Sequence, residues 1–170
     1  FGRIGSGDTI IGGTGVDYVS FDVSNQTAGL TINNLLTGAW MGGTWTEIES
    51  ASGKLSQGND EITVEMSQNY INGHTGTDTL IIDYSSGALA DGRTATSISF
   101  NSGSGALYLS GGSNQSISFP NFERFVITGT TGNDSIDGYY GTTGNTFYGH
   151  DGDDNLYGGV NAGADLLDGG

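Results

Sequence analysis

Large apolar residues recur at intervals of nine along three stretches of the chain, and most of them stand between polar neighbours. Ile62, Ile71 and Leu80 form the clearest run. One apolar residue between polar ones predicts a very short strand whose central side chain points inward, because side chains alternate across a strand. The residues expected to stack into a narrow core are Ile10, Val19, Ile62, Ile71, Leu80, Ile136, Phe147, Leu156 and Leu167.

The intervening stretches alternate apolar and polar residues over longer runs, which predicts further strands. The alternating pairs are Leu30/Ile32, Ile98/Phe100, Leu107/Leu109 and Ile117/Phe119. Turn-forming clusters such as Gly111-Gly112-Ser113-Asn114 separate these runs. Because no segment has a helical period, the pattern predicts an all-β fold.

Each recurring apolar residue lies near the end of a nine-residue copy that opens with a turn, usually rich in glycine. Residues 12–20 match G-G-x-G-x-D-x-U-x at every specified place, where U is a large apolar residue. We call the sixth residue of a copy the Asp place, and its second residue the second place. Nine copies, in blocks of two, three and four, put these residues at the Asp place: Asp8, Asp17, Asp60, Asn69, Asp78, Asp134, Asn145, Asp154 and Asp165.

Two copies are expected to make one full coil, so that alternate copies stack on the same side of the molecule. Asp8 and Asp17 then face opposite edges. The stacked pairs that this arrangement predicts are Asp60 with Asp78, Asp134 with Asp154, and Asn145 with Asp165.

The spacing suits calcium. Ca²⁺ takes six to eight oxygen ligands from carboxylates and carbonyls, whereas Mg²⁺ demands a smaller, stricter octahedron. Glycine turns let backbones approach closely and aim carbonyl oxygens into one space. The predicted ligands are therefore all the Asp-place residues together with the turn glycines Gly13, Gly15, Gly76, Gly132, Gly152 and Gly163. Asn69 and Asn145 supply oxygen without charge, so sites that use them should be weaker.

Composition strengthens the case for a cation. The chain has 19 Asp and Glu against 4 Lys and Arg, for a net charge of −15. Such a surface argues against nucleic acid and anionic membranes, and its self-repulsion predicts that a cation completes the fold. There is no cysteine, and no apolar run approaches the length that spans a bilayer. An EF-hand starting at Asp151 fails, because Leu156 and Ala162 replace its glycine and glutamate.

These motifs resemble the RTX family, the hemolysin-type calcium-binding repeat proteins. The resemblance implies a right-handed parallel β-roll with Ca²⁺ between successive turns, type I secretion, and folding outside the cell or at its surface. We therefore expect residues 1–170 to be one β-solenoid segment of a larger protein. Its RTX blocks span about 3–20, 55–81 and 129–170, and longer spacer coils span 21–54 and 82–128.

Three pairs of residues invite a second interpretation. His74 and His150 could be metal ligands or a general base, but their shared second place favours turn residues. Trp40 and Trp45 could stack on sugars, although packing over a wide coil or a contact between chains is favoured. Glu49 and Glu123 could form an acid/base pair, but their similar positions before a repeat block favour structural ligands or caps.

No motif of nucleophilic, phosphate-binding or metalloprotease chemistry is present, so the sequence predicts that the chain is not an enzyme. The favoured function is a calcium-binding structural module. Its expected partners are calcium ions and neighbouring segments of the same larger chain, with self-association as a further expectation. Two alternatives stay open: a segment of a calcium-dependent adhesin, surface-layer or filament assembly, and an accessory module of a secreted hydrolase or epimerase.

Overall fold

The computed structural model describes residues 7–64, 70–87, 96–102, 106–110, 115–139, 141–160 and 163–170. Its regular elements are strands, apart from two short 3-10 turns, η1 (Leu35–Thr37) and η2 (Ala39–Met41), which confirms the all-β class. Most strand pairs are parallel. Within these ranges, no helix is long and apolar enough to cross a membrane.

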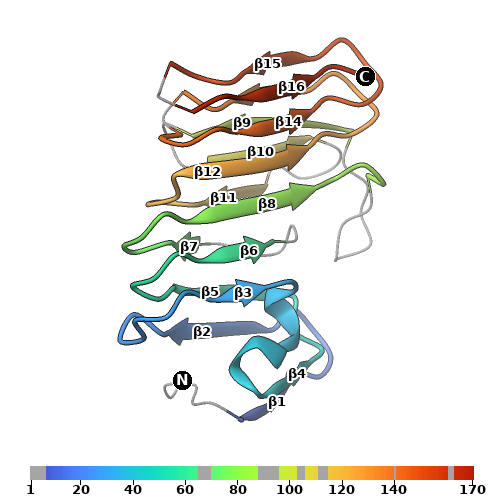
Figure 1. Ribbon diagram of the computed structural model, residues 1–170. Coiled ribbons are helices and arrows are strands. Elements are labelled where there is room, and N and C mark those ends of the chain that lie inside the picture. Colours follow the sequence, from blue (N-terminus) through green and yellow to red (C-terminus); the bar gives the residue numbers. More distant parts are fainter. Residues whose placement is uncertain are drawn as a thin grey trace.

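Two large sheets face each other (Figure 1). The eight-stranded sheet has the order β15 (Asn155–Tyr157), β13 (Ser135–Asp137), β9 (Ser97–Asn101), β10 (Ala106–Ser110), β11 (Gln115–Ser118), β7 (Tyr70–Asn72), β5 (Ser50–Lys54), β2 (Tyr18–Asp22). The six-stranded sheet has the order β16 (Leu166–Asp168), β14 (Thr146–Tyr148), β12 (Arg124–Thr128), β8 (Thr79–Asp83), β6 (Glu61–Thr63), β3 (Thr31–Ile32). A small third sheet pairs β1 (Thr9–Ile11) with β4 (Thr44–Thr46).

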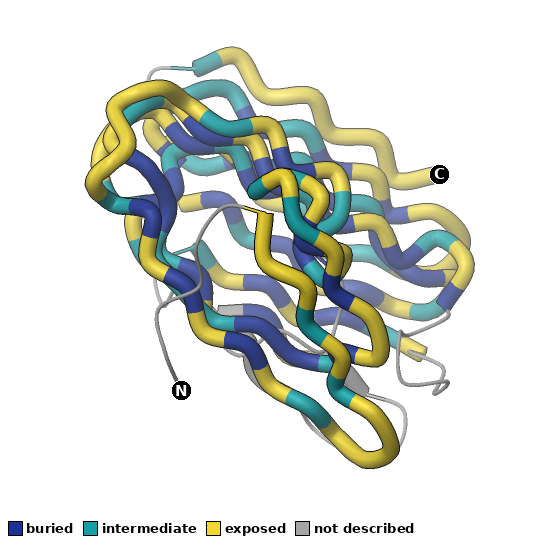
Figure 2. Tube along the Cα trace, turned by 90° about the horizontal axis from the view of Figure 1, so that it is seen from below, coloured by how far each residue is buried: buried dark blue, intermediate teal, exposed yellow. Residues whose placement is uncertain are grey.

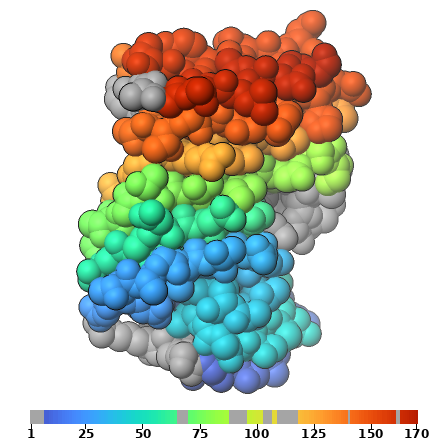
Figure 3. Space-filling model, in the orientation of Figure 1, coloured from blue at the N-terminus to red at the C-terminus, as the bar shows by residue number. Residues whose placement is uncertain are grey.

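The chain alternates between the two large sheets. From β5 to β8 and again from β13 to β16, each strand lies in the sheet opposite its predecessor. Neighbouring strands of one sheet are therefore two copies apart, as Glu61 opposite Thr79 shows. A two-residue insertion widens the interval where Ser135 lies opposite Asn155. Apart from the two spacers, the chain advances along one direction, so that its segments form successive bands from the N-terminal to the C-terminal end (Figure 3).

The core is the thin layer between the sheets, where buried residues gather (Figure 2). Phe100 of β9 and Phe125 of β12 meet across it with ring centroids 5.0 Å apart. The predicted core residues are buried, except that Ile10 and Leu156 are partly buried and Leu167 is 44% exposed. Leu167 departs from the expectation because β16 is an edge strand, so its inner side has fewer neighbours.

The second spacer differs from the expected simple coil. Its strands fall where the alternation predicts, but β9, β10 and β11 pair antiparallel. Ala106 lies opposite both Asn101 and Ser118. The spacer thus folds back on itself and supplies three neighbouring strands to the eight-stranded sheet between β7 and β13.

The first spacer packs its tryptophans inward, as expected. Trp45 is 3% exposed and lies edge-on to Trp40, with centroids 5.7 Å apart. Trp40 in turn meets Phe21 at 5.0 Å. The Asn34 side chain caps η1 by accepting a hydrogen bond from the Leu36 N–H at 2.9 Å. This aromatic cluster covers the core beside β2 and β5.

Candidate functional site

The Asp-place residues stack in the predicted pairs. The Asp60 N–H donates to Asp78 Oδ1 at 2.8 Å, and the Asp134 N–H donates to Asp154 Oδ1 at 2.9 Å. The third pair, Asn145 with Asp165, repeats this bond at 2.8 Å. Parallel register places equivalent turns over one another, so each carboxylate reaches the neighbouring backbone.

Glu49 and Glu123 extend the same columns as structural caps. Glu49 Oε2 accepts from the Asp17 N–H and Glu123 Oε2 accepts from the Asp78 N–H, both at 2.8 Å. Each glutamate also donates its own N–H to the carbonyl of the same aspartate. The two glutamates make equivalent bonds in separate turns, which supports their interpretation as structural ligands or caps.

Two Asp-place carboxylates are satisfied by protein donors. The Ser56 N–H donates to Asp60 Oδ2 at 3.0 Å and its hydroxyl to Oδ1 at 2.7 Å. The Thr130 N–H and hydroxyl make the same contacts with Asp134, at 2.6 and 3.1 Å. Sequence analysis missed these partners, although a serine or threonine at the second place was the available signal.

Three other carboxylates keep a buried oxygen without a donor. Within the described part of the chain, Oδ2 of Asp17, of Asp78 and of Asp154 has no hydrogen-bond partner. The Asp78 side chain as a whole is fully buried, whereas Asp17 and Asp154 are half-buried. A buried carboxylate oxygen without a donor is costly unless a cation or a proton neutralises it.

Burial also raises the pKa of two Asp-place carboxyl groups, those of Asp78 and Asp134. The pKa of Asp78 is raised to about 7, chiefly by desolvation, with a smaller contribution from the charges of Asp60 and Glu123 and with a hydrogen bond from the Asp60 N–H acting against it. Desolvation likewise raises the pKa of Asp134, with the Asp154 charge adding to it while bonds from Ile98 and Thr130 oppose it. The ionised form of these two carboxyl groups is therefore disfavoured where the copies stack.

Without calcium, we expect the folded fraction to fall as pH rises from 5 to 8. The folded-state pKa of Asp78 lies above its value of 3.8 in the open chain. The folded state therefore binds the proton more tightly, and this stabilisation, complete below 3.8, is lost as pH rises through about 7. Far-UV circular dichroism in calcium-depleted buffer measures the folded fraction at each pH. Because general charge repulsion acts in the same direction, Asp78→Asn is the control: an equally steep slope in that variant would contradict the assignment.

The geometry at Asp78 leaves room for carbonyl ligands. A Cβ placed on Gly73 would lie 2.6 Å from Asp78 Oδ2 and 2.0 Å from the Asn121 carbonyl oxygen, so both oxygens gather on one side of that glycine. Among the described residues, no three acids or histidines converge on one point. A cation here would use one carboxylate completed by backbone oxygens, and a donor set of that kind fits Ca²⁺.

The remaining predicted ligands differ in their surroundings. Asp8 and Asp165 are exposed, Gly163 is half-buried, and Asn69 lies outside the described residues. Asn145 is buried and satisfied, since its Oδ1 accepts from the Phe125 N–H at 3.1 Å and its Nδ2 donates to the Gly158 carbonyl at 2.9 Å. It therefore offers a cation less than the aspartates do.

The predicted turn glycines fall into two groups. Gly13, Gly15, Gly76 and Gly152 have positive φ, while Gly132 and Gly163 do not. His74 and His150 also lie in the left-handed region, with φ of 78° and 73°, which supports their interpretation as turn residues. Such a φ is uncommon for residues other than glycine, with histidine among the enriched exceptions.

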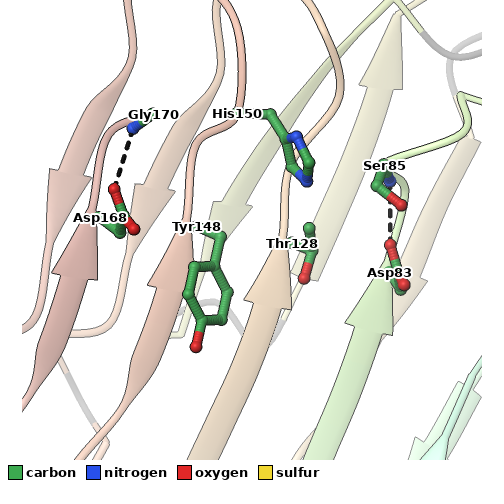
Figure 4. Close-up of a pocket in the computed structure, with 7 residues that line it drawn as sticks. All are labelled: Asp83, Ser85, Thr128, Tyr148, His150, Asp168 and Gly170. Carbon is green, nitrogen blue, oxygen red and sulfur yellow. Dashed lines mark hydrogen bonds between the residues drawn. The ribbon is translucent and has the colours of Figure 1, made fainter.

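A separate pocket of about 380 Å³ opens beside the ends of four strands of the six-stranded sheet (Figure 4). Asp83, Thr128, Tyr148 and Asp168 form one row across β8, β12, β14 and β16. Three strand spacings separate the two carboxylates by about 14 Å, so one ion cannot bridge them. Each carboxylate instead accepts a hydrogen bond from the backbone two residues later. The pocket is therefore a poor metal site.

Comparisons with known proteins found no family model that matches the chain, no matching curated protein and no matching solved structure.

Proposed function

We propose that this chain is a calcium-binding structural module of the RTX type. In this proposal the alternating parallel strands form a β-roll, or β-solenoid, and calcium ions lie between stacked turns. The observation that carries the proposal is the buried Oδ2 of Asp78, which has no donor in a column that also holds Asp60 and Glu123. A divalent cation would remove the cost of burying this charge.

Net charge supports the same conclusion. At −15, the chain repels itself in the compact state, and calcium binding offsets that repulsion. Because the stacked turns exist only in the folded chain, binding free energy becomes folding free energy. The module would stay largely unfolded at the low calcium level of the cytosol and fold in the higher calcium outside the cell. Its role is structural rather than catalytic, as part of a secreted or cell-surface protein.

A calcium titration followed by far-UV circular dichroism tests this function. We expect the β signal to rise cooperatively with calcium, to stay low with magnesium at the same ionic strength, and to reverse with a chelator. Calcium is favoured because its coordination is flexible, whereas magnesium holds its waters. Elemental analysis of the purified protein is the companion measurement: a folded chain free of calcium would overturn the proposal.

A further inference from the structure

Five of the turns that precede the Asp place adopt one of two conformations, and the turn before Asp165, with φ of 105° at Gly159 but no positive φ at Gly163, belongs to neither. In one, the second place lies in the left-handed region: φ is 92° at Gly13, 78° at His74 and 73° at His150. The glycine two residues later also has positive φ in all three copies. In the other, the second place is Ser56 or Thr130, and the following Gly58 and Gly132 keep φ outside that region. We call these the left-handed turns and the hydroxyl turns.

Turn type decides whether the carboxylate has donors. In the hydroxyl turns, the second residue directs its N–H and its hydroxyl onto the carboxylate. The same hydroxyl also accepts a bond at 3.1 Å from the N–H of Gly58 or Gly132, so it is held in place. In the left-handed turn before Asp78, the His74 N–H donates instead to Asn72 Oδ1 at 2.8 Å. All three aspartates that follow left-handed turns keep an Oδ2 without a partner.

The two turn types stack directly on one another. A Cβ on Gly76 would meet the Gly58 carbonyl oxygen at 2.4 Å, and one on Gly152 would meet the Gly132 carbonyl oxygen at 2.7 Å. Each contact sets a left-handed turn against a hydroxyl turn of the neighbouring coil. The same alternation thus occurs twice, at Asp60 with Asp78 and at Asp134 with Asp154.

We propose that, among the turns that the structure describes, cations bind at the left-handed turns through Asp17, Asp78 and Asp154, and that Ser56 and Thr130 replace the cation at Asp60 and Asp134. This inference rests on the calcium-binding function proposed above and specifies which copies perform it. In a hydroxyl turn, the hydrogens of the N–H and hydroxyl occupy the lone-pair positions of the carboxylate oxygens, where a cation would otherwise bind. In a left-handed turn the positions on Oδ2 are open.

Carbonyl oxygens lie beside two of the three left-handed sites, those of Asp78 and Asp17; the Gly149 carbonyl lies in the same way beside Asp134, so turn conformation rather than the carbonyl separates the two kinds of site. Asn121 and Glu47 both have positive φ, 60° and 57°. Their carbonyl oxygens would lie 2.0 and 1.9 Å from a Cβ on Gly73 and on Gly12, the glycines that also face the side chains of Asp78 and Asp17. A ligand oxygen is thus brought beside the open carboxylate twice, in different parts of the chain.

The test compares matched charge-neutral variants. Calcium bound per chain is measured by equilibrium dialysis and elemental analysis for the parent, Asp78→Asn and Asp60→Asn, each first checked for the parent far-UV spectrum in excess calcium. Asp78→Asn should bind one ion fewer, and Asp60→Asn should bind as many as the parent. The pair Asp154→Asn and Asp134→Asn repeats the comparison at an independent place.

The outcomes separate the two proposals. A parent that binds no calcium would refute the calcium-binding function itself. A parent that binds calcium, with equal losses in Asp60→Asn and Asp78→Asn, would refute the division between turns and leave the function standing. If the Asp60 and Asp134 variants do not fold, anomalous diffraction from parent crystals grown in calcium decides. Ions within coordination distance of Asp60 or Asp134 would overturn the inference, and ions at Asp78 and Asp154 alone or with Asp17 would support it.

Discussion

Replacing Asp60 with alanine should lower the free energy of unfolding by about 3–5 kcal/mol, because it leaves several buried hydrogen-bond donors without an acceptor. Asp60 is 2% exposed and accepts from the Leu30 N–H, the Ser56 N–H and the Ser56 hydroxyl. The Leu30 bond ties the entrance of β3 to the turn before β6. Urea unfolding in saturating calcium measures the loss, which should be present even when every cation site is filled.

Two controls show whether the donors are responsible. Asp60→Asn keeps an acceptor for Leu30 and should recover part of the loss. Asp151→Ala removes the same charge from an exposed turn residue and should change stability by less than about 0.5 kcal/mol. If Asp151→Ala were as destabilising as Asp60→Ala, charge rather than hydrogen bonding would account for the effect.

A methyl group at Gly73 should destabilise the protein by about 3 kcal/mol or more, because it enters occupied space. Its Cβ would lie 2.0 Å from the Asn121 carbonyl oxygen, a backbone atom that cannot swing aside, and 2.6 Å from Asp78 Oδ2. Gly73 must therefore separate from the turn before β12, which also disturbs the Asp78 site. We expect Gly73→Ala to have a lower melting temperature and a lower calcium affinity than the parent.

Gly169→Ala is the matched control for this substitution. A Cβ there meets nothing within 4 Å, and the glycine does not need a positive φ. It should leave the melting temperature and the calcium affinity close to those of the parent. Parent-like stability of Gly73→Ala would show that the two coils are spaced more widely than the structure describes.

Repetition made much of the fold predictable. The nine-residue interval fixed which side chains point inward, and Ile62, Ile71, Leu80 and Ile136 are fully buried. Strict register also predicted the stacked pairs, because two copies per coil leave no other partner for Asp60 or Asp134. Where the period is strict, local spacing determines long-range contacts.

The parts that escaped prediction depend on contacts without a period. The antiparallel pairing of β9, β10 and β11 arises in a spacer whose alternation specifies strands but not their direction. The two turn types were missed because the pattern treats the second place as glycine, whereas Ser56 and Thr130 supply side-chain donors there. A single hydroxyl changes the partner of a carboxylate without changing the period.

The hydrogen bonds that the carboxylates of the Asp-place aspartates and of the two glutamates accept all run in one direction along the chain. In each of them, the carboxylate belongs to the later residue and the donor to the earlier one, as in Leu30 to Asp60, Asp60 to Asp78 and Asp78 to Glu123. A coil that has already formed therefore presents open N–H groups, and the next coil brings the acceptors that fill them. When the coils order from the N-terminal side, each new carboxylate finds the N–H group of the preceding coil already in place. Ordering from the C-terminal side would first bury carboxylates that have no donors. The column is thus suited to vectorial, one-way growth.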